Sequence, residues 1–205
     1  MFGNLSSSLR TLVIAGVVLF GLYAVFGDTA PSGPQTADMG EVLDRTEFAM
    51  TQFDAFAQQS GVQALDDGQM DQFSLYLAQV LNADPRFYDK TMGIELQQDA
   101  SLVGFADDNA DQIRDVGEAK LFTLEIDSEN NRLIATDETG AGTHRGFSGT
   151  GLLAGVLLGN MLSRQSAAGV QPGAFNGRQT TARSAYKAPR SARSRARSGG
   201  FSVGK

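Results

Sequence analysis

One acidic stretch of the chain, residues 107–118, carries the side chains whose types and spacing could do chemistry. Counted from its first residue, oxygen-bearing side chains occupy positions 1, 3, 5, 9 and 12, and these are Asp107, Asn109, Asp111, Asp115 and Glu118. This is the ligand spacing of an EF-hand loop, in which a calcium ion collects oxygen ligands. The spacing predicts a calcium site, with an acidic loop exposed to water as the alternative.

Two positions depart from the calcium-loop pattern. Gln112 stands at position 6, where the sharp turn favours glycine, and Arg114 stands at position 8, where a branched apolar residue is usual. A partial match to the same spacing begins at Asp127. Because a second match indicates that acidic composition can generate the pattern by itself, both interpretations of residues 107–118 stay open.

The composition excludes several classes of site. The chain has no cysteine, which excludes disulfides, thiolate nucleophiles and cysteine-ligated metals. Its single histidine, His144, lies in a glycine-rich stretch, where we expect a solvated loop residue rather than a catalytic group. The sequence holds no phosphate-binding loop or nucleophile motif, and no pair of carboxylates stands out for acid–base work. It therefore predicts a protein that is not an enzyme.

The first apolar segment, residues 11–27, contains no charge and lies between Arg10 and Asp28. As a helix it would cover about 26 Å, which suffices for a bilayer core of about 30 Å with slight thinning. We predict a transmembrane anchor, with a cleaved signal peptide as the alternative. The basic residue before the segment and the acidic residues after it place residues 1–10 in the cytoplasm and residues 28–145 in the periplasm of a bacterium.

The second apolar segment, residues 146–163, is also uncharged. Gly151, Gly155 and Gly159 form two overlapping Gly-x-x-x-Gly repeats, which line one face of a helix and let another backbone approach closely. The repeats predict a glycine-packed apolar helix that crosses or re-enters the membrane. A helix on the membrane surface and a helix of a water-soluble domain are the alternatives.

The charges divide sharply along the chain. All 23 acidic residues fall between Asp28 and Glu138, so the net charge of −6 describes neither end. Residues 164–205 carry only basic charges among many Ser, Ala and Gly residues, which predicts a disordered basic tail. Anionic lipid is its expected partner, nucleic acid is less favoured, and a solvated tail without a partner is the alternative. The arginines that would make these contacts are Arg190, Arg193, Arg195 and Arg197.

The elements that must position these residues belong to an α+β fold, in which two helices precede a small antiparallel sheet. Apolar periodicity predicts helices over residues 38–60 and 68–82. Alternation predicts strands around residues 94–96 and 102–105, followed by a hairpin of residues 120–126 and 132–136. The predicted acidic domain spans residues 38–145 and follows a linker at residues 28–37.

The C-terminal third contains the apolar run from Gly151 to Leu162, then Gln171-Pro172, and Arg197-Ser-Gly-Gly-Phe201 near its end. In these residues the chain resembles YgiB-like proteins, a family of uncharacterised bacterial envelope proteins. Family members carry a lipid-modified cysteine, which this chain lacks. The resemblance implies a bacterial envelope location and no particular activity.

Together these features predict a non-enzymatic protein of the bacterial inner membrane that acts by association, with itself or with another membrane protein. The periplasmic domain and the glycine-lined helix would make the contacts, and the tail would be cytoplasmic if the second segment crosses. A membrane-anchored domain that senses calcium or another ligand is the second hypothesis, and a membrane-bound enzyme is the third. No cofactor is predicted apart from calcium.

Overall fold

The computed structural model describes residues 37–147 and 155–188. Its first helix, α2 (Met39–Gln59), begins at Asp38, whose side chain accepts a hydrogen bond of 2.8 Å from the amide of Gly40. Such a cap satisfies an amide that the helix itself leaves unpaired. The buried side of α2 includes Val42, Ala49 and Phe53, which recur at helical spacing.

The second helix, α3 (Asp67–Leu81), begins with a capping box. The Asp66 carboxylate accepts from the amide of Gln69, and the Gln69 side chain accepts from the amide of Asp66. Phe53 of α2 meets Phe73 of α3 edge to face, with 5.2 Å between the ring centroids. Both predicted helices are confirmed to within one residue at each end.

A buried arginine joins α2 to the end of α3. The guanidinium of Arg45, which is 1% exposed, donates to the carbonyls of Val80 at 3.1 Å, Ala83 at 2.6 Å and Pro85 at 2.6 Å. It also lies 4.8 Å from the ring centroid of Phe87. A cation at this place is favoured because the last carbonyls of a helix lack partners and carry partial negative charge.

Six strands form one sheet in the order of the chain. The first five are antiparallel neighbours joined by hairpins, and the sixth pairs in parallel with the fifth. They are β1 (Met92–Leu96), β2 (Leu102–Ala106), β3 (Lys120–Asp127), β4 (Arg132–Asp137), β5 (Gly142–Gly146) and β6 (Thr180–Ala182). The first four confirm the predicted strands, whereas β5 and β6 were not predicted.

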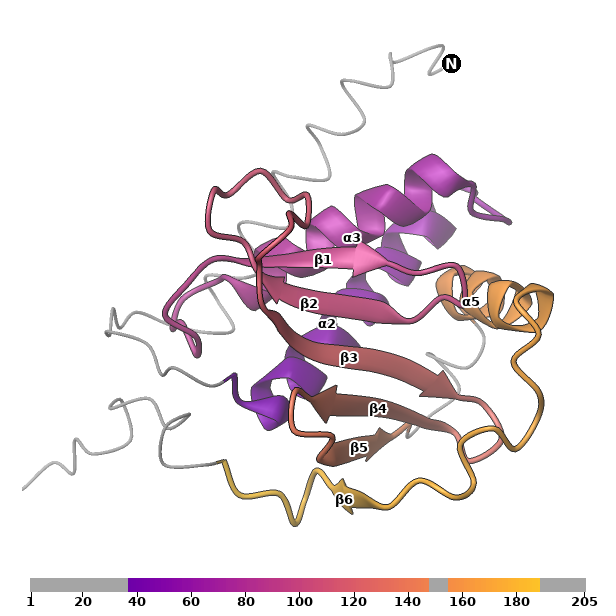
Figure 1. Cartoon of the computed structure of the whole chain (residues 1–205). Helices are drawn as coiled ribbons and strands as arrows, with labels where there is room; N and C mark the ends of the chain where they lie inside the picture. Colours follow the sequence, from indigo (N-terminus) through magenta and orange to yellow (C-terminus); the bar gives the residue numbers. More distant parts are fainter. Residues whose placement is uncertain (1–36, 148–154, 189–205) are drawn as a thin grey trace, which may run out of the picture.

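The helices cover one face of the sheet. In Figure 1, α2 and α3 lie behind the strands and α5 (Val156–Ala167) lies at the end where β1 and β3 finish. The largest core side chains lie between these layers; they include Leu43, Met50, Phe73, Leu77, Leu81, Leu102, Phe122 and Leu124. The result is a mixed α+β fold that leaves the other face of the sheet towards the viewer.

The prediction of membrane-spanning helices is wrong for the part of the chain that the structure describes. No helix within residues 37–147 and 155–188 has the length and apolar character needed to cross a bilayer. Residues 156–163 of the second apolar segment form most of the twelve-residue helix α5, which packs Leu157, Leu158 and Met161 into the core and also carries Arg164 and Gln165. The predicted anchor at residues 11–27 lies outside the described residues.

The predicted glycine-lined helix face is not present as expected. Gly155 precedes α5 instead of lying within it, and a Cβ there would stand 1.8 Å from Asp54 Oδ2 of α2. The close approach lets the Asp54 carboxylate accept a 2.8 Å hydrogen bond from the amide of Leu157, so that α2 caps α5. A Cβ at Gly159 would have no neighbour within 4 Å, and Gly151 lies outside the described residues.

The prediction of a disordered tail from residue 164 is also wrong as far as residue 188. Arg183 donates to the Asp44 carboxylate at 2.6 Å, and the Tyr186 hydroxyl accepts from the amide of Met39 at 3.2 Å. β6 lies between these anchors and the end of α5, along the edge of the sheet (Figure 1). The C-terminal segment is therefore part of the same folded unit as α2.

Candidate functional site

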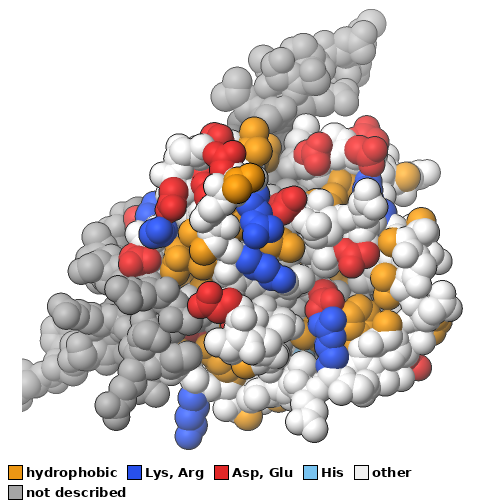
Figure 2. All heavy atoms as spheres, viewed as in Figure 1, with side chains coloured by type: hydrophobic (Ala, Val, Ile, Leu, Met, Phe, Trp, Pro, Cys, Tyr) orange, Lys and Arg blue, Asp and Glu red, His pale blue; other side chains and the backbone are white. Residues whose placement is uncertain are grey.

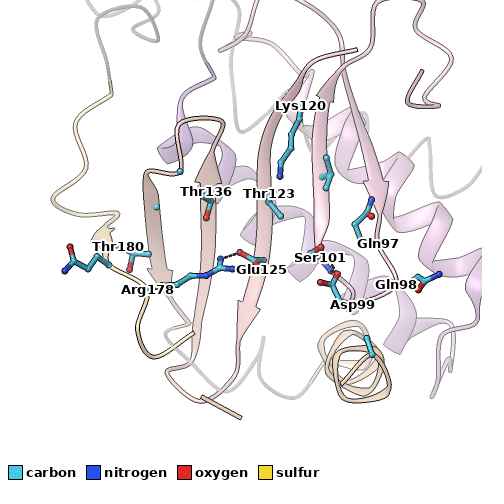
Figure 3. Close-up of a pocket in the computed structure, with 15 residues that line it drawn as sticks. Gln97, Gln98, Asp99, Ser101, Lys120, Thr123, Glu125, Thr136, Arg178 and Thr180 are labelled. Carbon is cyan, nitrogen blue, oxygen red and sulfur yellow. Dashed lines mark hydrogen bonds and ion pairs between the residues drawn. The ribbon is translucent and has the colours of Figure 1, made fainter. Parts of the chain in front are cut away.

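The face of the sheet that the helices leave uncovered holds a hollow with a volume of about 1020 Å³. We call this surface the open face; its residues include Ser101, Val103, Thr123, Glu125, Thr136, Arg178 and Thr180. Figure 3 shows Thr123 and Glu125 on β3, Thr136 on β4 and Thr180 on β6 along this surface. The strands fix the backbone beneath them, so that the surface is preformed.

Strand register explains why these side chains share one surface. Val103 of β2 lies opposite Thr123 of β3, and Thr123 lies opposite Thr136 of β4. The same row continues through Gly142 of β5 to Thr180 of β6. Because side chains alternate between the two faces of a strand, the neighbours of this row, such as Leu124 and Ala135, point into the core instead.

The open face carries a few charged residues of both signs. Arg178 makes a bidentate ion pair with Glu125, in which Nη2 lies 2.8 Å from Oε1 (Figure 3). Lys120 marks the opposite end of β3, and Asp99 accepts a 2.7 Å hydrogen bond from the Ser101 hydroxyl at the β1–β2 turn. Figure 2 shows the two signs of charge as separate residues among uncharged groups on this side. The open face therefore presents hydrogen-bonding groups without a large field of one sign.

A buried ion pair fixes the segment that borders the open face. Asp127, which is 1% exposed, accepts from Arg132 Nε at 2.7 Å, and Arg132 also donates to the Phe175 carbonyl and to Thr180 Oγ1 at 3.1 Å. Burial raises the pKa of the Asp127 carboxyl, but hydrogen bonds from Arg132 and Asn130 outweigh burial and hold it below its usual value. The hairpin of β3 and β4 thereby holds the residues that lead into β6.

His144 lies in β5, and not in the loop that its glycine-rich context predicted. Its Nδ1 is 2.8 Å from the Thr180 hydroxyl. Burial and the nearby charge of Arg132 lower the pKa of the imidazole, which favours the neutral ring at physiological pH. The contacts of His144 tie β5 to β6, and they identify a structural role for it.

The five residues of the predicted calcium site lie in the loop between β2 and β3, where they bind one another and the loop backbone. The buried Asp107 carboxylate accepts from the amides of Asp111 at 3.2 Å and Gln112 at 3.0 Å. Asn109 donates to Asp111 and Asp115, and Glu118 accepts from the amide of Asp115 at 2.9 Å. In residues 37–147 and 155–188, no group of three or more acidic or histidine side chains is arranged to hold a metal ion.

The arginines that were predicted to contact anionic lipid or nucleic acid, Arg190, Arg193, Arg195 and Arg197, lie outside the described residues.

The sequence analysis did not identify the open face. Its signal was present in the alternation of Thr123 and Glu125 with buried neighbours on β3. That alternation distinguishes the two sides of a strand. It does not show that helices pack on only one face of the whole sheet.

Comparisons of the chain with protein-family models, with curated proteins and with solved structures gave no match. The resemblance to YgiB-like proteins stays a prediction. The function is therefore inferred from the geometry of the described residues.

Proposed function

We propose that the protein is a non-enzymatic association module that binds a protein surface, in another protein or in a second copy, on the open face of its sheet. The observation that carries the proposal is the one-sided cover of the sheet, which leaves on the open face a hollow of about 1020 Å³ lined mostly by hydrogen-bonding side chains. Stable protein interfaces combine a preformed shape with about ten hydrogen bonds and no unpaired buried charge.

The arrangement of groups on the open face supports association. Thr123, Thr136 and Thr180 offer hydroxyls that both donate and accept, and their β-branched side chains have little rotational freedom to lose on binding. Glu125 and Arg178 neutralise each other, so a partner can cover them together. Burying such a matched pair costs less than burying either charge alone.

Calcium sensing has weaker support. The carboxylates of Asp107 and Glu118 already accept hydrogen bonds from backbone amides of their own loop, and calcium would have to replace those contacts. The sequence of the acidic loop therefore does not favour a calcium site over a loop that its own hydrogen bonds stabilise.

Photo-cross-linking in the cells from which the chain comes tests the association directly. A photoreactive phenylalanine analogue placed at Thr123 or Thr136 should give one discrete adduct, with another protein or with a second copy. The same group at Gln58, exposed on α2, is the matched control and should give none. Adducts from Gln58 alone, or no adduct from either position of the open face, would contradict the proposal.

A further inference from the structure

The outer edge of β1 forms one side of a second hollow, of about 540 Å³, between α3 and the loop that joins β2 to β3. We call it the edge groove. Its floor follows the chain from Ile94 to Gln98, and its two walls contribute Leu75 from α3 and Ile113 from the loop. In Figure 1, β1 is the outermost strand on this side of the sheet, opposite the edge made by β6.

Register shows which backbone groups face the edge groove. Thr91 and Gln97 make hydrogen bonds to the β2 side, to Asp107 and Ser101, at 2.9 and 2.8 Å. Because pairing alternates along an antiparallel strand, the amides and carbonyls of the even-numbered residues point the other way, towards the groove. Within the described part of the chain, no hydrogen bond reaches those groups of Ile94 or Leu96.

A side chain already imitates a pairing strand at the start of this edge. The Asn82 amide accepts from the Met92 amide at 2.8 Å through Oδ1 and donates to the Met92 carbonyl at 2.7 Å through Nδ2. These are the two hydrogen bonds that a neighbouring strand would make. Asn82 therefore closes the edge at Met92 and leaves it open from Ile94 onward, where the groove begins.

The walls of the edge groove expose apolar side chains. Leu75 is 47% exposed and Ile113 is 66% exposed, and these two and Val116 are the large apolar residues most exposed in the described part of the chain. Val116 belongs to the same loop as Ile113. Exposed apolar residues scattered over a surface need no explanation, but Leu75 and Ile113, which line one groove beside an unpaired strand edge, mark a contact surface.

The charge of the groove indicates what it would bind. Asp67, Asp71 and Glu95 line it together with Arg114 and Arg164, and ion pairs join Arg164 to Asp67 and Arg114 to Glu95. Asp71 has no ionic partner in the described part of the chain, so the three carboxylates of the groove outnumber its two guanidinium groups. A cationic ligand is therefore complementary to the groove.

We infer that the edge groove binds an extended segment of a partner protein as an added strand beside β1, and that this segment carries apolar side chains and a lysine or arginine. Its backbone would pair with the outward groups of Ile94 and Leu96, which gives affinity without regard to sequence. Leu75 and Ile113 would select apolar side chains on alternate positions, and Asp71 would select the cation. The edge groove shares Gln97 and Gln98 with the hollow of the open face, but the inference rests on the unpaired edge of β1 and does not depend on the proposed function.

Selection from a random octapeptide library displayed on phage, against the full chain, supplies the probe. Leu96→Pro removes the outward amide but keeps the β1–β2 ladder, because the amide of residue 96 points away from β2. Leu96→Val is its matched control, and Leu75→Lys changes one wall at an exposed position that does not threaten the fold. Circular dichroism and thermal melting establish that each variant is folded.

Selected peptides should be rich in apolar and basic residues, and fluorescence anisotropy should give affinities for wild type and Leu96→Val that agree within about twofold. Leu96→Pro and Leu75→Lys should each weaken binding by about tenfold or more. Peptide should also slow hydrogen exchange at the amides of Ile94 and Leu96. Failure to enrich such peptides, equal binding by all variants, or sedimentation that shows the β1 edge occupied by a second copy would overturn the inference.

Discussion

At the scale of single residues, a few carboxylates decide how distant parts of the chain meet. Asp54 caps α5 from α2, Asp44 holds Arg183 of the C-terminal segment, and Asp127 holds Arg132. The first two contacts join residues far apart in the sequence, so local patterns could not predict them. Asp127 and Arg132 lie within one hairpin. These three acidic residues therefore stabilise the fold.

Asp127 should give the stability a recognisable pH dependence. Because the folded-state pKa lies below the ordinary 3.8, the carboxylate contributes stability that is present above that value and is lost as pH falls through the folded-state pKa. Asp127→Asn should lower the free energy of unfolding at pH 7 by about 2 kcal/mol, the size of hydrogen bonds to a charged group. Urea unfolding of the purified chain between pH 7 and 3 measures both effects.

The difference between wild type and Asp127→Asn should be constant above about pH 5 and shrink below about pH 4, where the wild-type carboxylate begins to gain its proton. The matched control is Asp89→Asn at an exposed position, which should leave stability within about 0.5 kcal/mol at every pH. A difference for Asp127→Asn that stays constant down to pH 3 would contradict the role of its charge.

At the scale of elements, local sequence patterns predicted the helices and the hairpin that local interactions stabilise. The helices α2 and α3 follow from apolar periodicity and from capping residues such as Asp38 and Asp66, and the β3–β4 hairpin follows from alternation around a polar turn. α5 was misassigned because its apolar and glycine residues suit the core of a folded domain and the interior of a membrane equally well. Only contact with Asp54 and with the core distinguishes a buried helix from a membrane helix.

β6 was missed for a related reason. Its residues, Thr180–Ala182, lie in a polar, arginine-rich stretch whose composition is typical of disorder. The stretch is held by Asp44, Glu125 and Arg132, which belong to elements earlier in the chain. The open face was missed with it, because which side of a sheet stays uncovered depends on where α5 and the C-terminal segment pack.

The two glycines of the described Gly-x-x-x-Gly repeat should respond in opposite ways to the same substitution. Gly155→Ala places a Cβ against the Asp54 carboxylate and should destabilise the fold by about 1–3 kcal/mol through overpacking. Gly159→Ala meets no neighbour within 4 Å and should stabilise by up to about 1 kcal/mol, because alanine favours a helix more than glycine does. Urea unfolding measures both.

Each glycine variant is the other's control, because the chemical change is identical and the positions are one helical turn apart. Equal destabilisation by Gly155→Ala and Gly159→Ala would contradict the packing of α5 described above. It would instead favour a shared helix contact along the glycine repeat, as the sequence alone had predicted.

At the scale of the whole molecule, the C-terminal segment returns to the beginning of the fold. Arg183 and Tyr186 contact α2 at its first turns, and β6 extends the sheet at the edge opposite β1. The helices α2, α3 and α5 lie on one side of the sheet, and the open face is on the other side (Figure 1). This closure of the fold by residues 155–188 is the claim from which the open face follows.

An engineered disulfide tests that closure most directly, because the chain contains no other cysteine. A Cβ built at Gly142 of β5 lies 3.6 Å from the Thr180 Cβ of β6, within the range of about 3.5–4.5 Å that a disulfide requires. The variant Gly142→Cys with Thr180→Cys should form an intramolecular disulfide nearly completely under mild oxidation. Peptide mapping and thiol titration measure its yield.

The matched control combines Gly142→Cys with Thr181→Cys, whose side chain points to the opposite face of the sheet and should leave both thiols free. Nearly complete disulfide at residue 180 together with free thiols at residue 181 is the predicted result. Equal and low yields in the two variants would show that residues 180–182 do not pair with β5, and would contradict the closed fold.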